Sequence, residues 1–213
     1  FCVILYYPKL VKKFCMKILF DLDGTVTAAE TLPIISRHFS VEKEIEKLTK
    51  ETVNGNIPFI ESFIRRVNML GHLPVSEVSA LLSEVSLYPK ISDFIRAHRD
   101  ICVIVTGNLD CWCKSLGEKI GCLGYYSEAE VEDNKVVKIK SILRKERIVD
   151  MYKSLGEEVV FVGDGNNDLE AMRQADISIA AGLTHYPAKS LYSLSDYMVF
   201  SEEALCRQLN QLL

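Results

Sequence analysis

The chain has 213 residues, of which 48% are hydrophobic and 25% are charged, and its formal net charge is -4 at pH 7. This length suits one sizeable domain, or a core domain with a small accessory one. The mild acidity argues against a nucleic-acid-binding protein, and no apolar run reaches the roughly 18 residues that a membrane-spanning helix needs. We therefore expect a soluble protein that binds neither nucleic acid nor membrane.

Two features bear on the compartment of the protein. The seven cysteines are odd in number and irregularly spaced, in a chain too long to need disulfide bonds for stability, so we expect reduced thiols and a cytoplasmic protein. Residues 1–15 are apolar first and basic second, the reverse of a secretory signal. Because Met16 stands directly before the first strand-like segment, residues 1–15 are expected to be an extension outside the domain.

Short apolar segments followed by turn residues predict the strands. They lie at 17–20, 101–105, 159–162 and 177–180, with 197–200 as a possible fifth. Their nearly continuous apolar character is typical of a parallel sheet covered on both faces. Helical patterns lie between and after them, at 91–98, 109–120, 145–155, 169–175 and 202–212. This alternation predicts a doubly wound α/β fold.

Two stretches break the alternation. Residues 28–85 contain no convincing strand but carry successive helical patterns at 32–39, 41–52, 58–70 and 75–85. We interpret them as a small helical cap domain inserted after the first strand, so that 16–27 and 86–213 form the core domain. Residues 125–139 alternate in polarity and turn at Asp133-Asn134, which predicts a small antiparallel hairpin.

Polar residues follow three of the predicted strands. The segments are D-L-D-G-T at 21–25, T-G-N at 106–108 and G-D-G-N-N-D at 163–168. In open α/β sheets ligands bind beyond the carboxyl ends of the strands, so these segments are expected at one edge of the sheet. A hard divalent cation is the simplest partner that makes so many carboxylates tolerable there, and Mg²⁺ is commonly bound by one or two carboxylates together with a substrate phosphate.

This ordered set of motifs, from Met16 onward, resembles the haloacid dehalogenase superfamily of phosphohydrolases. The resemblance implies that Asp21 is a nucleophile that becomes an aspartyl phosphate, and that Asp23 is the general acid and later the general base. It also implies that Mg²⁺ is bound by Asp21, by the backbone carbonyl of Asp23 and by Asp164. Asn167 and Asp168 would complete the metal shell or orient its ligands.

The same resemblance assigns the phosphate-binding groups. Thr106 would donate its hydroxyl to a phosphate oxygen, with Gly107 beside it. The family uses a lysine at the start of the helix that precedes the G-D-G strand. Lys145 fits that position best, although Lys140 and Lys138 are close in sequence and remain alternatives.

The position of the insertion resembles the phosphoserine phosphatase branch of this superfamily. Glu30 has the spacing from Asp21 of the glutamate that meets the substrate ammonium in that branch. Arg66 best matches the arginine that binds the substrate carboxylate, with Arg65 as its competitor. Asn108 stands where the branch carries a glycine whose backbone approaches the substrate, and this departure bears on the substrate rather than on the reaction type.

We therefore expect a magnesium-dependent hydrolase of phosphomonoesters, acting on a small phosphorylated metabolite, with O-phosphoserine as the first candidate. Another small phosphate ester, a 2-haloacid, or a catalytically inactive binding role are the alternatives. Dehalogenation counts as less favoured because it needs neither an acid at Asp23 nor a metal site at Asp164. The chain is expected to be a monomer or a homodimer. The four histidines, His38, His72, His98 and His185, show no ligand spacing and are expected at the surface.

Overall fold

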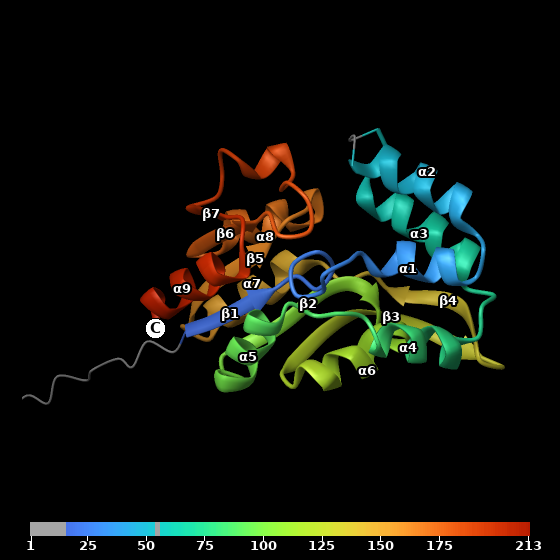
Figure 1. The fold of residues 1–213 in the computed structure, drawn as a ribbon, viewed down its shortest axis with the longest axis horizontal. Helices are drawn as coiled ribbons and strands as arrows, with labels where there is room; N and C mark the ends of the chain where they lie inside the picture. The colour runs from blue at the N-terminus through green and yellow to red at the C-terminus, as the bar shows by residue number, and fades with distance from the viewer. Residues whose placement is uncertain (1–15, 54–55) are drawn as a thin grey trace, which may run out of the picture.

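The computed structural model describes residues 16–53 and 56–213, so the predicted extension at 1–15 lies outside the described residues. Its centre is a seven-stranded sheet in the order β4-β3-β2-β1-β5-β6-β7 (Figure 1). The strands are β1 (Met16–Phe20), β2 (Cys102–Leu109), β3 (Leu123–Glu132), β4 (Lys135–Ser141), β5 (Glu158–Gly163), β6 (Ile177–Ala181) and β7 (Tyr197–Val199). All neighbouring pairs are parallel except β3 and β4.

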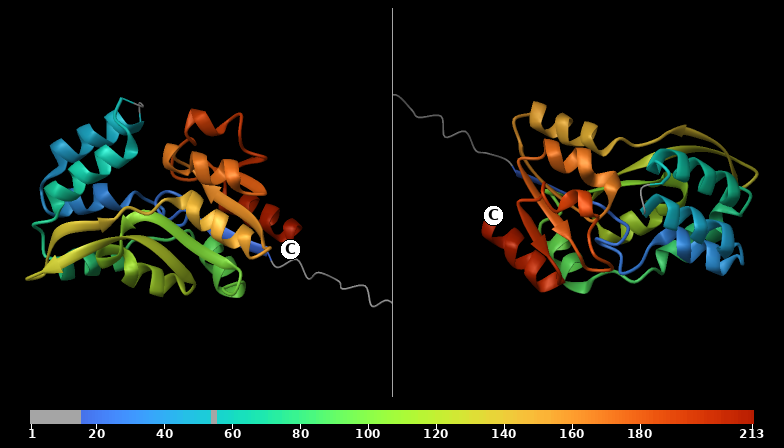
Figure 2. Two further views of the ribbon diagram at one scale, coloured as in Figure 1. Left: turned by 180° about the vertical axis from the view of Figure 1, so that it is seen from behind. Right: turned by 90° about the horizontal axis from the view of Figure 1, so that it is seen from above.

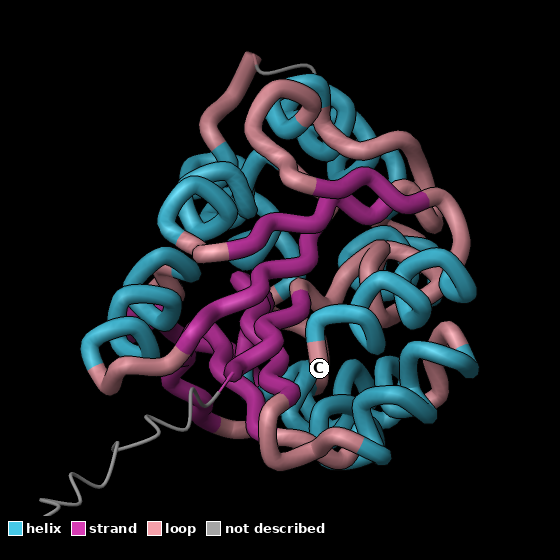
Figure 3. The backbone as a smooth tube through the Cα atoms, turned by 90° about the vertical axis from the view of Figure 1, so that its left-hand side faces the viewer, coloured by secondary structure: helices cyan, strands magenta, loops and turns pink. Residues whose placement is uncertain are grey.

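Helices cover both faces of the sheet (Figure 3). On one face, α5 (Pro89–Ala97), α6 (Asp110–Ile120) and α9 (Glu202–Leu212) share a core with Ile18 and Phe20 of β1. On the other, α7 (Lys145–Ser154) and α8 (Leu169–Gln174) share a core with Leu19. The split follows from the strand itself, because successive side chains point to opposite faces. The predicted doubly wound α/β architecture is confirmed.

The strand β2 is longer than the sequence predicts. The expected strand stops at residue 105, whereas β2 continues through 106–108 to Leu109 and stays paired with β3, with a register shift between Val105 and Leu109. The hydroxyl of Ser127, on β3, donates to the backbone carbonyl of Gly107 at 2.7 Å and helps to hold this irregular stretch. The predicted phosphate-binding segment at 106–108 therefore lies within β2 rather than in a loop after it.

Four helices fill the segment between β1 and α5: α1 (Thr31–His38), α2 (Glu42–Val53), α3 (Phe59–Leu70) and α4 (Val75–Ser83). The two ends of this segment lie side by side, because Thr27 and Leu87 form an isolated antiparallel β-bridge. The helices α2 and α3 stand side by side over the sheet (Figure 2), whereas α4 packs against α6. The division of 28–85 from the rest as a cap domain stays a prediction.

Two further features of the described residues concern membrane-spanning helices and cysteines. Neither 16–53 nor 56–213 contains a helix that is both long and apolar enough to cross a membrane. The five cysteines in these ranges, Cys102, Cys111, Cys113, Cys122 and Cys206, are free thiols. The short helices η1 (Asn166–Asp168) and η2 (Lys189–Leu191) complete the described elements.

The predicted hairpin is formed by β3 and β4, and its turn also caps a helix. Asp133 and Asn134 have positive φ values of 45° and 63°, as both central residues of a type I′ turn require. The backbone carbonyl of Asn134 accepts from the N–H of Val75 at 2.7 Å, and its side-chain oxygen accepts from the N–H of Ser76 at 2.9 Å. These N–H groups begin α4, whose own N-cap residue is Pro74 and offers no side-chain acceptor.

We expect Asn134→Gly to lower the free energy of unfolding by about 1 kcal/mol, because glycine keeps the positive φ but removes the side-chain cap of α4. Asn134→Ala should cost more, since it also places a β-carbon in the left-handed region. Chemical denaturation measures both changes, with Asp133→Gly as the control that leaves the cap intact. An Asn134→Gly variant as stable as the unmodified protein would show that the cap contributes nothing.

Candidate active site

Three neighbouring strands bring the predicted motifs together. Asp21 follows β1 in the middle of the sheet, Thr106 lies in β2 on one side, and Asp164 follows β5 on the other. The chain order reverses its direction across the sheet at β1, which is where open α/β sheets form ligand-binding crevices. A pocket of about 480 Å³ opens here and is lined by these residues and by Phe59 and Arg66 of α3.

Asp21 is buried, and the contacts of its carboxylate are made through one of its two oxygens. Its Oδ1 lies 2.7 Å from Nζ of Lys145 and accepts a hydrogen bond from the N–H of Leu22 at 2.7 Å. Its Oδ2 accepts no hydrogen bond from the described residues. Burial, followed by repulsion from Asp168, raises the pKa of Asp21 well above its ordinary value. The carboxylate is therefore oriented through Oδ1, and burial and the neighbouring carboxylates destabilise its charged form.

Lys145 is the buried cation of the site. It begins α7, and its Nζ lies 2.6 Å from Oδ1 of Asp168 as well as 2.7 Å from Asp21. Burial would lower the pKa of Lys145, but Asp168 and Asp21 outweigh it and raise that pKa, so the ammonium stays charged. The alternatives Lys138 and Lys140 are exposed on β4. Of the three lysines, Lys145 is the one that the structure brings to Asp21.

Asp23 lies beside the pocket with its carboxylate fixed. Its Oδ1 accepts from the N–H of Thr31, at the start of α1, at 2.7 Å. Burial, followed by the nearby charge of Glu30, raises the pKa of Asp23 to about 6. An acid with a pKa near the working pH can both give and take a proton, so Asp23 is suited to general acid and base chemistry.

The G-D-G-N-N-D segment holds two buried aspartates. Oδ2 of Asp168 accepts from the N–H groups of Asp164 and Gly165, at 3.0 and 2.9 Å, and so fixes the loop after β5. Oδ1 of Asp164 accepts from the hydroxyl of Thr25 at 3.1 Å. Burial raises the pKa of Asp164 to about 6. Asn167, from the same loop, lines the pocket.

The β2 segment contributes a hydroxyl and an amide. The Thr106 hydroxyl oxygen accepts from the N–H of Asn108 at 3.1 Å, which leaves its proton available for a ligand. Asn108 is buried, and its side-chain N–H donates to the Thr31 hydroxyl at 2.6 Å. Gly107 is covered by the ring of Phe59, which lies 3.1 Å from the position that a β-carbon would take. A side chain at Gly107 would therefore collide with α3.

The two arginines of α3 differ completely in environment. Arg66 is 7% exposed and lines the pocket, while Arg65 is exposed and pairs with Glu61. The Nε of Arg66 donates to the carbonyl of Ser62 at 3.3 Å, and its guanidinium makes no ion pair within the described part of the chain. Burial lowers the pKa of Arg66. A buried guanidinium that makes no ion pair with the described residues has donors free to bind an anion.

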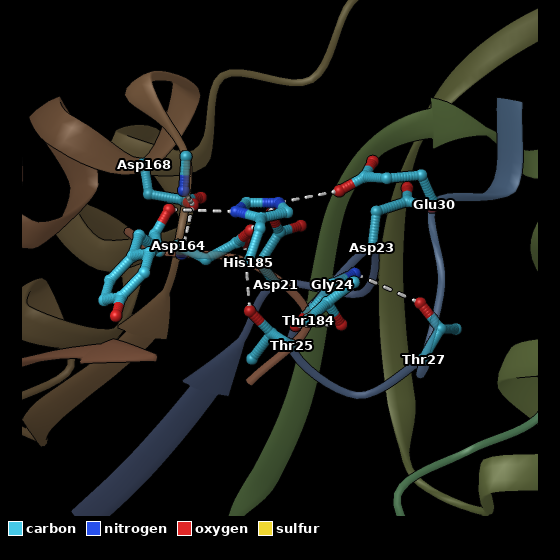
Figure 4. A network of polar contacts seen from close by, with 12 residues as sticks. Asp21, Asp23, Gly24, Thr25, Thr27, Glu30, Asp164, Asp168, Thr184 and His185 are labelled. Carbon is cyan, nitrogen blue, oxygen red and sulfur yellow. Dashed lines mark hydrogen bonds and ion pairs between the residues drawn. The ribbon is translucent and has the colours of Figure 1, made fainter. Parts of the chain in front are cut away.

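Glu30 is the N-cap residue of α1 and contacts His185, for which the sequence predicts a surface position. Nε2 of His185 is 3.2 Å from Oε1 of Glu30 and 3.0 Å from Oδ2 of Asp164 (Figure 4). These contacts to Asp164 and Glu30 raise the pKa of His185 to about 11. Its side chain is 46% exposed, as expected, yet the ring lines the pocket. No sequence spacing links His185 to the motifs, because 155 residues separate it from Glu30.

The charges of the site fit a divalent cation. Asp21, Asp164 and Asp168 are buried, and each places a carboxylate oxygen within 4.8 Å of the others. The site contains five carboxylates, those of Asp21, Asp23, Glu30, Asp164 and Asp168, and three cations, those of Lys145, Arg66 and His185. Buried carboxylate oxygens clustered in this way can hold a divalent cation.

Comparison with known proteins gives the family. A family model described as haloacid dehalogenase-like hydrolase matches residues 17–176. The chain belongs to the haloacid dehalogenase-like hydrolases. Phosphoserine phosphatase of Methanocaldococcus jannaschii is 29% identical over 176 residues, which cover 76% of this chain and 83% of that protein. Phosphoserine phosphatase of Archaeoglobus fulgidus is 29% identical over 176 residues, which cover 76% of this chain and 51% of that protein.

Solved structures of this hydrolase family have the same fold. A structure titled as a phospho-aspartyl intermediate analogue of phosphoserine phosphatase superposes with a TM-score of 0.80 at 25% identity. The match covers 94% of this chain and 100% of that chain. The match to that structure therefore includes the helical segment after β1. The resemblance of the sequence motifs to the haloacid dehalogenase superfamily is confirmed.

The buried carboxylates make the stability of the metal-free hydrolase depend on pH. The pKa values of Asp23 and Asp164 rise from 3.8 to about 6 on folding, so the folded state binds protons more tightly than the unfolded state. The resulting stabilisation is fully present below pH 3.8 and is lost as the pH rises through about 6. We expect the melting temperature in a chelator to be lower at pH 7.5 than at pH 5, and Mg²⁺ to restore it at pH 7.5.

Scanning calorimetry of the Asp164→Asn variant provides the control for this dependence. The amide removes one titrating group, so the drop in melting temperature between pH 5 and pH 7.5 should become smaller. Asp133→Asn, in the exposed hairpin turn, should leave the drop unchanged. A melting temperature that rises with pH in the chelator would contradict the expected sign.

Proposed function

We propose that this hydrolase is a magnesium-dependent phosphomonoesterase that transfers the phosphoryl group of a small metabolite to Asp21 and then to water. The observation that carries the proposal is the Asp21 carboxylate, whose Oδ1 is held by Lys145 and the Leu22 amide while Oδ2 accepts no hydrogen bond from the described residues. Carboxylates of this kind act as nucleophiles that form covalent phosphoryl intermediates.

In the proposed first step, Oδ2 of Asp21 attacks phosphorus and the bond from phosphorus to the ester oxygen breaks. Lys145 and the Thr106 hydroxyl hold phosphate oxygens, with Gly107 beside them, so that attack is in line. Asp23 gives its proton to the leaving alcohol. Its raised pKa of about 6 supports this role, because a useful fraction remains protonated near neutral pH.

In the second step, Asp23 takes a proton from water, and the water oxygen attacks the aspartyl phosphate to release inorganic phosphate and the Asp21 carboxylate. A bound Mg²⁺ would be held by Asp21, the backbone carbonyl of Asp23 and Asp164, supported by Asn167 and Asp168, and would neutralise charge on the phosphoryl oxygens. The cluster formed by Asp21, Asp164 and Asp168, whose carboxylate oxygens lie within 4.8 Å of one another, supports this choice of cofactor.

O-phosphoserine is the substrate we propose first. The relatives from Methanocaldococcus jannaschii and Archaeoglobus fulgidus are both named phosphoserine phosphatase. Arg66 supplies a guanidinium for a substrate carboxylate and Glu30 a carboxylate for a substrate ammonium, and both side chains line the same pocket as Asp21. Asn108 lines the same pocket, and its side-chain N–H donates to the Thr31 hydroxyl.

We expect Asp21→Asn to lower kcat for phosphate release by on the order of 10³-fold or more, because the amide is a poor nucleophile. The assay measures inorganic phosphate from O-phospho-L-serine and from a panel of sugar, nucleotide and alcohol phosphates, with Mg²⁺ and with a chelator. Chelation should abolish turnover by the unmodified protein. Full turnover by Asp21→Asn would overturn the nucleophile assignment.

Arg66→Met should raise KM for O-phosphoserine roughly 10- to 100-fold, since it removes charged hydrogen bonds to the substrate carboxylate. KM for phosphoethanolamine, which has no carboxylate, should not rise. Arg65→Met is the matched control, because Arg65 is exposed on the same helix and pairs with Glu61. Equal effects of Arg66→Met on both esters would show that Arg66 acts on the fold rather than on the carboxylate.

A further inference from the structure

Ser127, a buried residue of β3, joins two segments of the active site through its hydroxyl. The hydroxyl donates to the backbone carbonyl of Gly107, in β2, at 2.7 Å. It also accepts from the backbone N–H of Leu143, just before α7, at 2.9 Å. Because a hydroxyl carries a single proton, Ser127 is the donor to one segment and the acceptor from the other. Ser127 is 0% exposed, so water does not compete for either bond.

The bond to Gly107 lies at the irregular stretch of the sheet. Between two paired positions, β2 has the three residues 106–108, where the neighbouring strand β3 has one (Figure 1). The ladder between these strands therefore cannot pair every backbone group of 106–108. The Ser127 hydroxyl supplies a donor for the Gly107 carbonyl and so holds this stretch next to Thr106.

The bond from Leu143 holds the chain where it enters α7. Lys145 is the first residue of α7, and the N-cap residue Arg144 makes no side-chain cap hydrogen bond. The N–H of Leu143, two residues before Lys145, is bound by Ser127 instead. This bond helps to set where α7 begins relative to β3, and from there Nζ of Lys145 reaches Oδ1 of Asp21 at 2.7 Å.

The two segments carry groups that the proposed reaction needs at a fixed separation. Thr106 and Lys145 are proposed to hold oxygens of the same phosphate, and such donors are most effective when they are in place before the substrate binds. A displacement of about 1 Å at groups of this kind can cost on the order of 100-fold in rate. Ser127 does not line the pocket, so it acts through these two groups rather than on the substrate.

We propose that Ser127 is a positioning residue, whose hydroxyl sets the Thr106-Gly107 segment and Lys145 at the separation that phosphoryl transfer requires. This inference rests on the phosphomonoesterase activity proposed above and adds to it a residue outside the sequence motifs. It concerns the phosphoryl group, which all the candidate substrates share. Loss of the hydroxyl should therefore slow the hydrolysis of different phosphate esters by the same factor.

The test removes the hydroxyl with Ser127→Ala and measures hydrolysis of O-phospho-L-serine and of phosphoethanolamine with Mg²⁺. We expect kcat to fall roughly 10- to 100-fold for both esters, with the ratio between them unchanged.

Ser178→Ala is the matched control. Ser178 is also a buried strand serine, and its hydroxyl donates to Oδ2 of Asp196 at 2.7 Å and accepts from the N–H of Asp196 at 3.1 Å. It lies near the start of β6, away from the carboxyl ends of the strands. Ser178→Ala should lower the melting temperature but leave kcat unchanged at a temperature where both variants are folded.

Two further measurements separate positioning from a general loss of structure. In a Thr106→Val background, the loss of kcat caused by Ser127→Ala should shrink at least about three-fold, because the hydroxyl that Ser127 positions is already absent. Binding of inorganic phosphate with Mg²⁺, measured by calorimetry, should weaken roughly ten-fold in Ser127→Ala and stay unchanged in Ser178→Ala. If Ser127→Ala does not fold, Ser127→Cys serves in its place, since a thiol of similar size is a much weaker donor and acceptor.

The inference is wrong if Ser127→Ala keeps its kcat, if Ser178→Ala loses kcat equally, or if the losses from Ser127→Ala and Thr106→Val multiply independently. If the unmodified protein binds phosphate but hydrolyses no ester, the proposed function fails, and the phosphate dissociation constants still decide the role of Ser127. If the unmodified protein binds no phosphate, both the function and this role of Ser127 fail.

Discussion

The burial of several carboxylates at the carboxyl end of β1 is the constraint on which the rest of the structure depends. Asp21, Asp164 and Asp168 come from two neighbouring strand ends, and their charges repel one another in a region poorly accessible to water. The fold compensates with the buried ammonium of Lys145 and with the two N–H groups that bind Asp168. A parallel sheet with β1 between β2 and β5 is what brings these groups to one point.

The parts of the fold that could be predicted are those that short, local segments of sequence determine. Continuous apolar runs gave strands within one or two residues of β1, β5 and β6, because a strand buried on both faces has no polar positions. The same reasoning ended β2 too early. Thr106, Gly107 and Asn108 are typical of a turn, yet pairing with β3 and the Ser127 hydroxyl keep them in the sheet. Tertiary hydrogen bonds decided what local preference could not.

The residues of the candidate site also differ in whether local sequence or tertiary contact determines their position. Asp21, Asp23 and Asp164 lie in motifs whose spacing is local, so their association follows once the strands are parallel. The choice of Arg66 over Arg65 has a helical reason, because about 100° of rotation separates successive residues. Arg66 shares the buried face of α3 with Ser62 and Leu70, while Arg65 points to solvent. His185 has no such signal, since it reaches Glu30 from a loop 155 residues away.

Lys145 and His185 contact different carboxylates of the site and differ in burial. Lys145 is almost completely buried between Asp21 and Asp168, so removing it would leave buried charges without a partner, and its position is tied to the nucleophile. His185 is 46% exposed and reaches Glu30 from a loop, where solvent can replace its contact at much lower cost. A substitution of His185 is therefore expected to cost the fold less than a substitution of Lys145.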